Sequence, residues 1–316
     1  MMDEKRETRD DWQARAHRFS HKAMATVFEV IILYDDADYA EQAAWTAFDE
    51  LDRLEGQLSR FIANSDICRI NNLGVDEPLQ IGLAAFECLQ ICARIYAGTD
   101  GAFDVTIGSG MESVKLNESR HTVELTDVAI TIDLGGVGKG YAVDRMAELL
   151  REWDIDTVLI HSGGSSVFAY GAPNSMKGWP VTLSNPGVPQ THSSRLATPV
   201  NSKQTLARVL LKNGALSGSG LQKGAHIIDP RRGRPIEDRR AAWACAADAA
   251  TADALSTAFM VMTPEEIEQY CLQHPDVKAL IVTGEKGGEK DKILWFGAWE
   301  TCGEFFLFFT EGSPDI

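Results

Sequence analysis

The sequence lacks the marks of membrane proteins, disulfide-rich secreted proteins and nucleic-acid-binding proteins. No segment approaches the ~20 uninterrupted apolar residues that a helix needs to span a bilayer. The six cysteines contain no C-x-x-C pair; Cys88 and Cys92, four apart on a predicted helix, are either buried thiols or a shared metal-binding face. Basic residues are few. The 30 Lys and Arg against 46 Asp and Glu give a net charge of −16, which argues against nucleic acid or an anionic membrane as the main partner.

The N-terminus also lacks the apolar core of a secretory signal. Residues 1–20 carry many charges and are predicted to form a leader, helical or mobile, ahead of a single domain over residues 21–316. The cysteines, which follow no disulfide spacing, suit a reducing compartment. We therefore expect a cytoplasmic protein without a membrane span.

Strand and helix patterns come in mixed clusters rather than in strict alternation, which favours an α+β fold. Asp36 is expected to cap a helix with apolar residues at helical spacing, and Thr263 a second helix with proline at its first position. Further helices are predicted over 84–96, 141–153 and 252–262, and a long loop over 185–204. Strands are predicted over 24–34, 157–161, 166–170, 180–183, 208–211, 242–247, 277–283 and 293–296, with a hairpin-like pair inside 123–134.

The segment 132–144, IDLGGVGKGYAVD, is the most informative one present. An apolar run ends at Gly135 and Gly136, and a helix begins after Gly138-Lys139-Gly140. Glycines let a backbone approach a ligand closely, and a helix start presents unpaired N–H groups to an anion. The spacing is not that of a Walker loop. The glycines either close a strand-to-helix turn or cradle a phosphate.

Asp253 and Thr257 lie four residues apart on a predicted helix and therefore share one face. A carboxylate and a hydroxyl are hard oxygen ligands, suited to Mg²⁺. The structural alternative is a hydroxyl that bonds back to its own helix and an ordinary acid in the first turn. Similarly, His226 beside Ile227 could be a hydrogen-bonded structural residue, and Phe103 and Asp104 could be a buried ring and a turn residue.

An ordered series of motifs carries a family resemblance. Its members are KAMATVFEV, LSRFIANSDICRIN, GAFDVTIG, the glycine segment 132–144, HSGGSSVFAYG, HIIDPRRGRP and TADALSTAF. Over roughly residues 20 to 285 the chain resembles the ApbE-type FAD:protein FMN transferases. The resemblance implies duplicated T-fold-like units of β-sheet packed with helices, and Mg²⁺-dependent transfer of FMN from FAD, with release of AMP, to a Thr or Ser hydroxyl of a partner flavoprotein.

The resemblance also assigns site residues. For Mg²⁺ it implies Asp253, Ser256, Thr257 and the carbonyl of Gly138. It gives catalytic roles to His226, which could take the proton of the target hydroxyl, and to Lys139, which could offset phosphate charge. The implied contacts to FAD or its flavin are Met24, Phe61, Ala102, Phe103, Asp104, Gly135, Tyr141, His226 and Ile227.

The chain departs from the family pattern in places. Residues 109–117, SGMESVKLN, stand where relatives have a Pro and a Trp-containing stretch, and SGSGL (217–221) replaces Thr-Ser-Gly-Asp; Ala25 replaces a glycine. Two alternatives to transfer remain. Water could replace the acceptor hydroxyl, which gives hydrolysis of FAD to FMN and AMP, and the altered segments leave open flavin binding without turnover. Family acceptors resemble Asp-x-x-Ser/Thr-Gly-Ala-Thr. No Gly-Ala-Thr occurs in this chain, so the acceptor is expected on another polypeptide.

Overall fold

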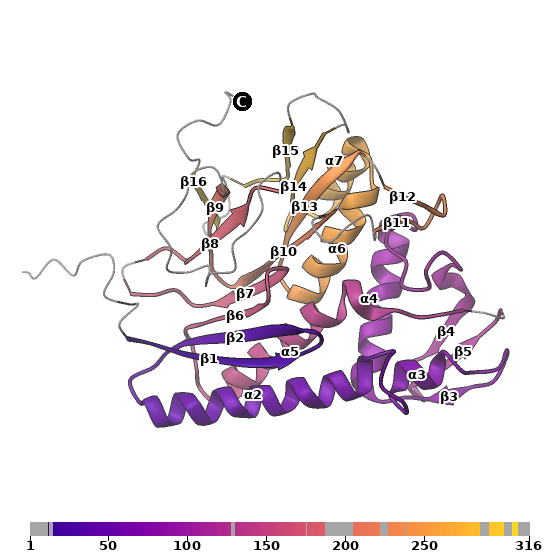
Figure 1. Cartoon of the computed structure of the whole chain (residues 1–316), viewed down its shortest axis with the longest axis horizontal. Coiled ribbons are helices and arrows are strands. Elements are labelled where there is room, and N and C mark those ends of the chain that lie inside the picture. Colours follow the sequence, from indigo (N-terminus) through magenta and orange to yellow (C-terminus); the bar gives the residue numbers. More distant parts are fainter. Residues whose placement is uncertain are drawn as a thin grey trace, which may run out of the picture.

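The computed structural model describes residue 12, residues 15–127, 130–174, 176–186, 205–221, 227–236, 238–284 and 291–299, and the backbone of 305–308. Its centre is an eight-stranded antiparallel sheet in the order β1-β2-β6-β7-β10-β13-β14-β15 (Figure 1). The strands are β1 (Ala16–Ala23), β2 (Thr26–Leu33), β6 (Val158–Ser162), β7 (Ser166–Tyr170), β10 (Gly214–Gly220), β13 (Arg239–Ala246), β14 (Lys278–Thr283) and β15 (Lys292–Phe296).

The two halves of this sheet are built in the same order. In the first, α2 (Ala37–Leu58) and α5 (Gly138–Glu152) come between the hairpins β1–β2 and β6–β7. In the second, α6 (Ala249–Val261) and α7 (Pro264–Gln273) come between the pairs β10–β13 and β14–β15. The halves join where β7 pairs with β10, and α5 and α6 pack against each other there. The expected α+β class is confirmed.

Smaller elements extend this frame. Between α2 and α5 the chain forms α3 (Asp66–Ile70), β3 (Leu79–Gln80), α4 (Leu83–Gly98), the 3₁₀ turn η1 (Met111–Ser113), β4 (Val114–Asn117), β5 (Thr122–Leu125) and the 3₁₀ turn η2 (Leu134–Gly136). A second sheet contains β8 (Trp179–Ser184), β9 (Thr205–Leu211) and β16 (Phe305–Phe308), and a short hairpin contains β11 (Ile228–Asp229) and β12 (Arg234–Pro235).

The central sheet buries both of its faces. On one face Phe28 and Ile160 contribute to the large core shared with α2, α4, α5 and α6. On the other face Ile31 and Leu159 pack in a smaller core with Trp179 of β8 and with Trp12. Among the described residues no helix is both long and apolar enough to cross a membrane. Cys88 and Cys92 are 0% and 1% exposed, and burial raises the pKa of both thiols, as expected for structural cysteines.

Most predicted elements are found, with three differences. The predicted strand 24–34 is the second arm of a hairpin whose first arm, β1, begins at Ala16, inside the predicted leader. The predicted strand pair in 123–134 is instead β4–β5, over 114–125. Strand β10, GALSGSG, was not predicted, although it lies in the middle of the sheet. Much of the predicted 185–204 loop lies outside the described residues.

Candidate active site

The glycine segment forms a turn that leads into the N-terminus of α5. Asp133 Oδ1 accepts a hydrogen bond from the Gly135 amide at 2.9 Å, and η2 carries the chain into α5 at Gly138. The residue before α5, Val137, makes no side-chain capping bond. The helices α2, α6 and α7, in contrast, begin at Asp36, Asp248 and Thr263, whose side chains accept from backbone amides. The α5 N-terminus therefore keeps amides that can face an anion.

Asp253 lies on α6, in the second half of the fold, and its side chain binds the glycine turn. Its side chain is buried, and Oδ2 accepts from the Gly140 amide at 3.2 Å and lies 3.6 Å from Lys139 Nζ. Lys139 Nζ also donates to the Gly135 carbonyl at 2.8 Å. A carboxylate, an ammonium group and a helix start thus meet at one point.

Hydroxyl groups lie one helical turn further along α6. Ser219 Oγ of β10 lies 2.8 Å from Ser256 Oγ and 3.2 Å from Thr257 Oγ1. A Cβ added to Gly136 would lie 3.4 Å from Thr257 Oγ1 and 3.2 Å from the Phe103 ring. The segment 136–140 therefore reaches from Thr257 to Asp253. The structure brings together the four residues that the resemblance assigns to Mg²⁺, with the Gly138 position between the two contacts.

The donor set suits a magnesium ion that also binds substrate. The described residues contain no group of three or more His, Cys, Asp or Glu side chains that could form an all-protein cage. Asp253 Oδ2 is engaged by Gly140 and Lys139, whereas none of the described residues donates a hydrogen bond to Oδ1. One free carboxylate oxygen, hydroxyls and a carbonyl are hard ligands that leave most positions to phosphate and water, as Mg²⁺ commonly requires.

Asp104 organises the loop beside the turn. Its Oδ1 accepts from the amide and hydroxyl of Thr106 at 2.8 and 2.6 Å, and its Oδ2 accepts from the amides of Gly108 and Gly110, both at 3.2 Å. The amide of Asp133 donates to the carbonyl of Val105 at 2.8 Å, which joins this loop to the glycine turn. Ala102 and Phe103 are buried beneath it, at 1% and 3% exposure.

The other expected flavin contacts differ in whether their side chains are free to touch a ligand. Phe61 is 83% exposed, with the Arg60 guanidinium 4.7 Å from its ring centre, and Arg60 lies 3.3 Å from Asp133. Its ring is free to stack on a ligand beside the turn. Met24 is half-buried and its amide donates to Glu55.

The side chain of Tyr141 is already engaged. It is 4% exposed, and its hydroxyl donates to Glu87 Oε2 at 2.5 Å; burial and this bond raise its pKa. The phenol therefore joins α5 to α4, and any ligand contact by Tyr141 would come from its backbone.

The HIIDPRRGRP motif is only partly described. His226 lies outside the described residues. Ile227 is buried, and the following hairpin turns at Gly233, which has a φ of +64°, as expected for turn chemistry. Arg231 is bound to Glu266 at 2.9 Å, so it is not free to hold a phosphate, whereas Arg232 is largely exposed.

Two site residues were missed in the sequence. Asp144, one turn along α5 from Gly140, accepts from the amides of Ala249 and Ala250 at 2.7 and 2.8 Å. It thereby ties α5 to the start of α6. The sequence shows that Asp144 follows Gly140 by four residues. It does not show the partner of Asp144, because the Ala249 amide lies 105 residues further along the chain. Ser219 was noted only as a departure from the family pattern.

Comparison with known proteins identifies the family. The model of the ApbE family matches residues 24–281. A Klebsiella pneumoniae protein called FAD:protein FMN transferase is 25% identical over 281 residues, covering 78% of this chain and 79% of its own length. A Haemophilus influenzae protein of the same name is 23% identical and covers 85% of this chain and 87% of its own length.

Solved structures show the same fold. The flavin transferase ApbE from Vibrio cholerae superposes with a TM-score of 0.74 at 20% identity, covering 88% of this chain and 97% of that one. The apo form of the Pseudomonas stutzeri flavinyl transferase ApbE gives a TM-score of 0.74 at 22% identity, covering 89% and 94%. Since the family model spans most of the chain, and the fold and the ordered motifs agree with it, the chain belongs to the ApbE family.

Proposed function

We propose that the protein transfers FMN from FAD to a Thr or Ser hydroxyl of a partner flavoprotein, in a Mg²⁺-dependent reaction that releases AMP. The observation that carries the proposal is the meeting of the α5 N-terminus, which has no capping side chain at Val137, with Lys139, Asp253 and Thr257. Curated relatives are called FAD:protein FMN transferases, which supports this choice among reactions of a flavin dinucleotide.

Positive groups are concentrated where a diphosphate would need them. A protein of net charge −16 repels an anion at long range, so FAD must be met by local donors. The amides at the start of α5 and the Lys139 ammonium supply them. The exposed Phe61 ring is connected to the turn through Arg60 and Asp133, and it would stack on the isoalloxazine.

The residues that would hold Mg²⁺ are Asp253, Thr257, Ser256 and the carbonyl of Gly138. Bound there with the diphosphate, the ion would neutralise charge that develops on the phosphoryl oxygens. Lys139, which lies 3.6 Å from Asp253 Oδ2, would share this task.

The proposed transfer forms one P–O bond and breaks another. The acceptor hydroxyl oxygen bonds to the phosphorus of the FMN half, and the bridging P–O bond to the AMP half breaks, with AMP taking the electron pair. The hydroxyl proton must pass to a base, and we assign this role to His226. The loop held by Asp104 and the turn held by Asp253 would keep the two reacting groups in line.

Location and partner are part of the same proposal. Cys68, Cys88, Cys92, Cys245 and Cys271 are all free thiols, which supports a cytoplasmic protein. The acceptor would be a separate flavoprotein, because the chain has no Gly-Ala-Thr of its own.

The test is to incubate the pure protein with FAD and Mg²⁺, with and without a flavoprotein that carries the acceptor motif, and to measure AMP and intact masses. We expect the partner to gain one FMN and the enzyme's own mass to stay unchanged. AMP release at the same rate without the partner would support FAD hydrolysis instead, and FAD binding with no AMP would indicate a binding protein.

A variant pair separates the site from the fold. Asp253→Ala should abolish turnover, because it removes the charged metal ligand, whereas Glu124→Ala, at a partly exposed acid of β5, should leave it unchanged. Normal turnover by a folded Asp253→Ala protein would refute the metal assignment.

A further inference from the structure

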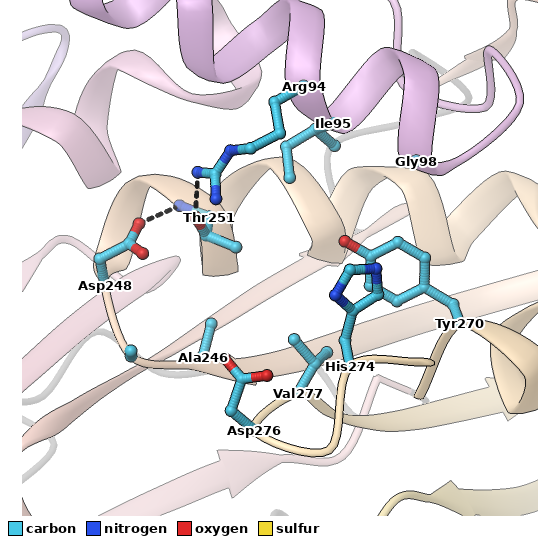
Figure 2. A pocket seen from close by; sticks show the side chains of 11 residues that line it. Arg94, Ile95, Gly98, Ala246, Asp248, Thr251, Tyr270, His274, Asp276 and Val277 are labelled. Carbon is cyan, nitrogen blue, oxygen red and sulfur yellow. Dashed lines mark hydrogen bonds between the residues drawn. The ribbon is translucent and has the colours of Figure 1, made fainter. Parts of the chain in front are cut away.

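A pocket that contains none of the candidate active-site residues lies beside the first turn of α6 (Figure 2). It is about 110 Å³ in volume and is lined by the end of α4, the first turn of α6 and the segment that joins α7 to β14. It opens to solvent, and Arg94, His274 and Asp276 of its lining are exposed. Thr251 lines it, whereas Asp253 faces α5. Residues two apart in a helix point in directions about 200° apart, so the two sites use different faces of α6.

The hydroxyl of a mostly buried tyrosine, Tyr270, points into this pocket. Tyr270 is 6% exposed; its ring packs edge-on against Phe259 and contacts the tilted ring of His274, with the centroids 4.4 Å apart. Its hydroxyl is directed toward Thr251 and Arg94 in Figure 2, yet it makes no hydrogen bond to any described residue. The hydroxyl can therefore donate one hydrogen bond to a ligand in the pocket and accept others.

Arg94 is the pocket's anion-binding group. The N-terminal amides of α6 are not free, because Asp144 accepts from Ala249 and Ala250, and Asp248 accepts from Thr251. The Arg94 guanidinium donates one hydrogen bond to Thr251 Oγ1 at 3.1 Å, which leaves other donors open to the pocket. The Thr251 hydroxyl proton adds a second donor beside it.

The pocket lining also contains two acidic residues. The carboxylates of Asp248 and Asp276 line the pocket, and Figure 2 shows Asp276 across from the Arg94 guanidinium. A simple anion would pair with Arg94 but would be repelled by these two carboxylates. A simple cation would be repelled by Arg94. A small molecule with a carboxylate at one end and an ammonium group at the other satisfies both.

We propose that this pocket binds a zwitterion of the size of a small α-amino acid. Its carboxylate would pair with Arg94 and accept from Thr251 and Tyr270, and its ammonium group would lie by Asp276. The volume fits this class: a cavity of about 150 Å³ holds benzene, and sites for drug-sized ligands exceed about 300 Å³. About five or six heavy atoms, as in glycine or alanine, therefore fit within it.

The test is calorimetric titration of the full-length protein with glycine, with sodium acetate and with methylammonium chloride. We expect saturable binding of one glycine per chain, and at least about tenfold weaker binding of the two half-ligands. Equal binding of acetate and glycine would overturn the zwitterion, and no heat with glycine at millimolar concentration would overturn the site.

Variants place the ligand in the pocket. Arg94→Met and Asp276→Asn should each weaken glycine binding by about tenfold, and Tyr270→Phe, which keeps the ring contacts, by several-fold. The matched controls Arg145→Met and Asp38→Asn, on α5 and α2, should bind as the parent does. Near-UV circular dichroism shows that each variant is folded. Unchanged glycine affinity in a folded Arg94→Met protein would refute the proposal.

Discussion

Two glycines two residues apart at the start of α5 should respond in opposite ways to the same substitution. A Cβ added to Gly140 would lie 2.1 Å from the Ala249 carbonyl oxygen, 2.6 Å from its carbon and 2.9 Å from the Ala250 Cα. All three are backbone atoms of α6, so no rotamer change can relieve the overlap. A Cβ on Gly138 would lie 3.7 Å from the nearest atom, Leu134 Cβ, which is ordinary contact.

We therefore expect Gly140→Ala to push α5 away from α6. Overpacking in a core costs about 1–3 kcal/mol. The movement also lengthens the hydrogen bonds from Ala249 and Ala250 to Asp144 and from Gly140 to Asp253, at about 1 kcal/mol for each bond lost. The free energy of unfolding should fall by roughly 3–5 kcal/mol. Gly138→Ala should change it by less than about 1 kcal/mol, toward higher stability.

The measurement is urea unfolding of the two variants and the parent, followed by far-UV circular dichroism, together with flavin binding followed by fluorescence. Gly140→Ala should lose both stability and flavin affinity, and Gly138→Ala should keep both, because its carbonyl stays in place. A Gly140→Ala protein as stable as the parent would refute the close approach of the two helices and the geometry of the site built on it.

Three further outcomes follow from single positions. Ala25 has a φ of +57°, where a side chain is strained, so Ala25→Gly should stabilise the protein by about 1 kcal/mol in urea unfolding, and a loss of stability would contradict this. Burial and the nearby Asp248 raise the pKa of Asp144 from 3.8 to about 8, so the folded state holds a proton that the unfolded chain has lost. Stability should thus decline as the pH rises from about 4 to 8, and Asp144→Asn should flatten the decline; equal pH profiles for the two proteins would exclude the effect. Lys139→Met should weaken FAD binding at low salt by at least about tenfold and reduce its salt dependence, whereas a variant with parental affinity would show that Lys139 faces no phosphate.

Features set by neighbouring residues were predictable from the sequence. Asp36 caps α2, Ser65 caps α3, and Thr263 and Glu266 form the capping box of α7, because each side chain bonds to amides within three residues. The helical spacing of Asp253 and Thr257 was likewise enough to place them on one face.

Features set by the fold were not predictable in this way. The strand β10 contains three glycines and two serines, a composition typical of a loop. It is a strand because its neighbours β7 and β13 supply hydrogen bonds on both sides, and because Gly218 leaves room for the Trp243 ring. The role of Tyr141 likewise depended on Glu87, which lies 54 residues away. Tertiary contacts of this kind leave no local pattern.

The meeting of α5 and α6 also has a consequence for synthesis of the protein on the ribosome. The bonds that define the site join Gly140 to Asp253 and Asp144 to Ala249, over separations of 113 and 105 residues. The first four strands of the sheet can pair once β7 has emerged, but Asp253 is made more than eighty residues later. A nascent chain that has completed its first half therefore presents the glycine turn without Asp253, Ser256 and Thr257. The capacity to bind a dinucleotide should arise in one late step, and a chain cut short before α6 would fold in part and remain inert.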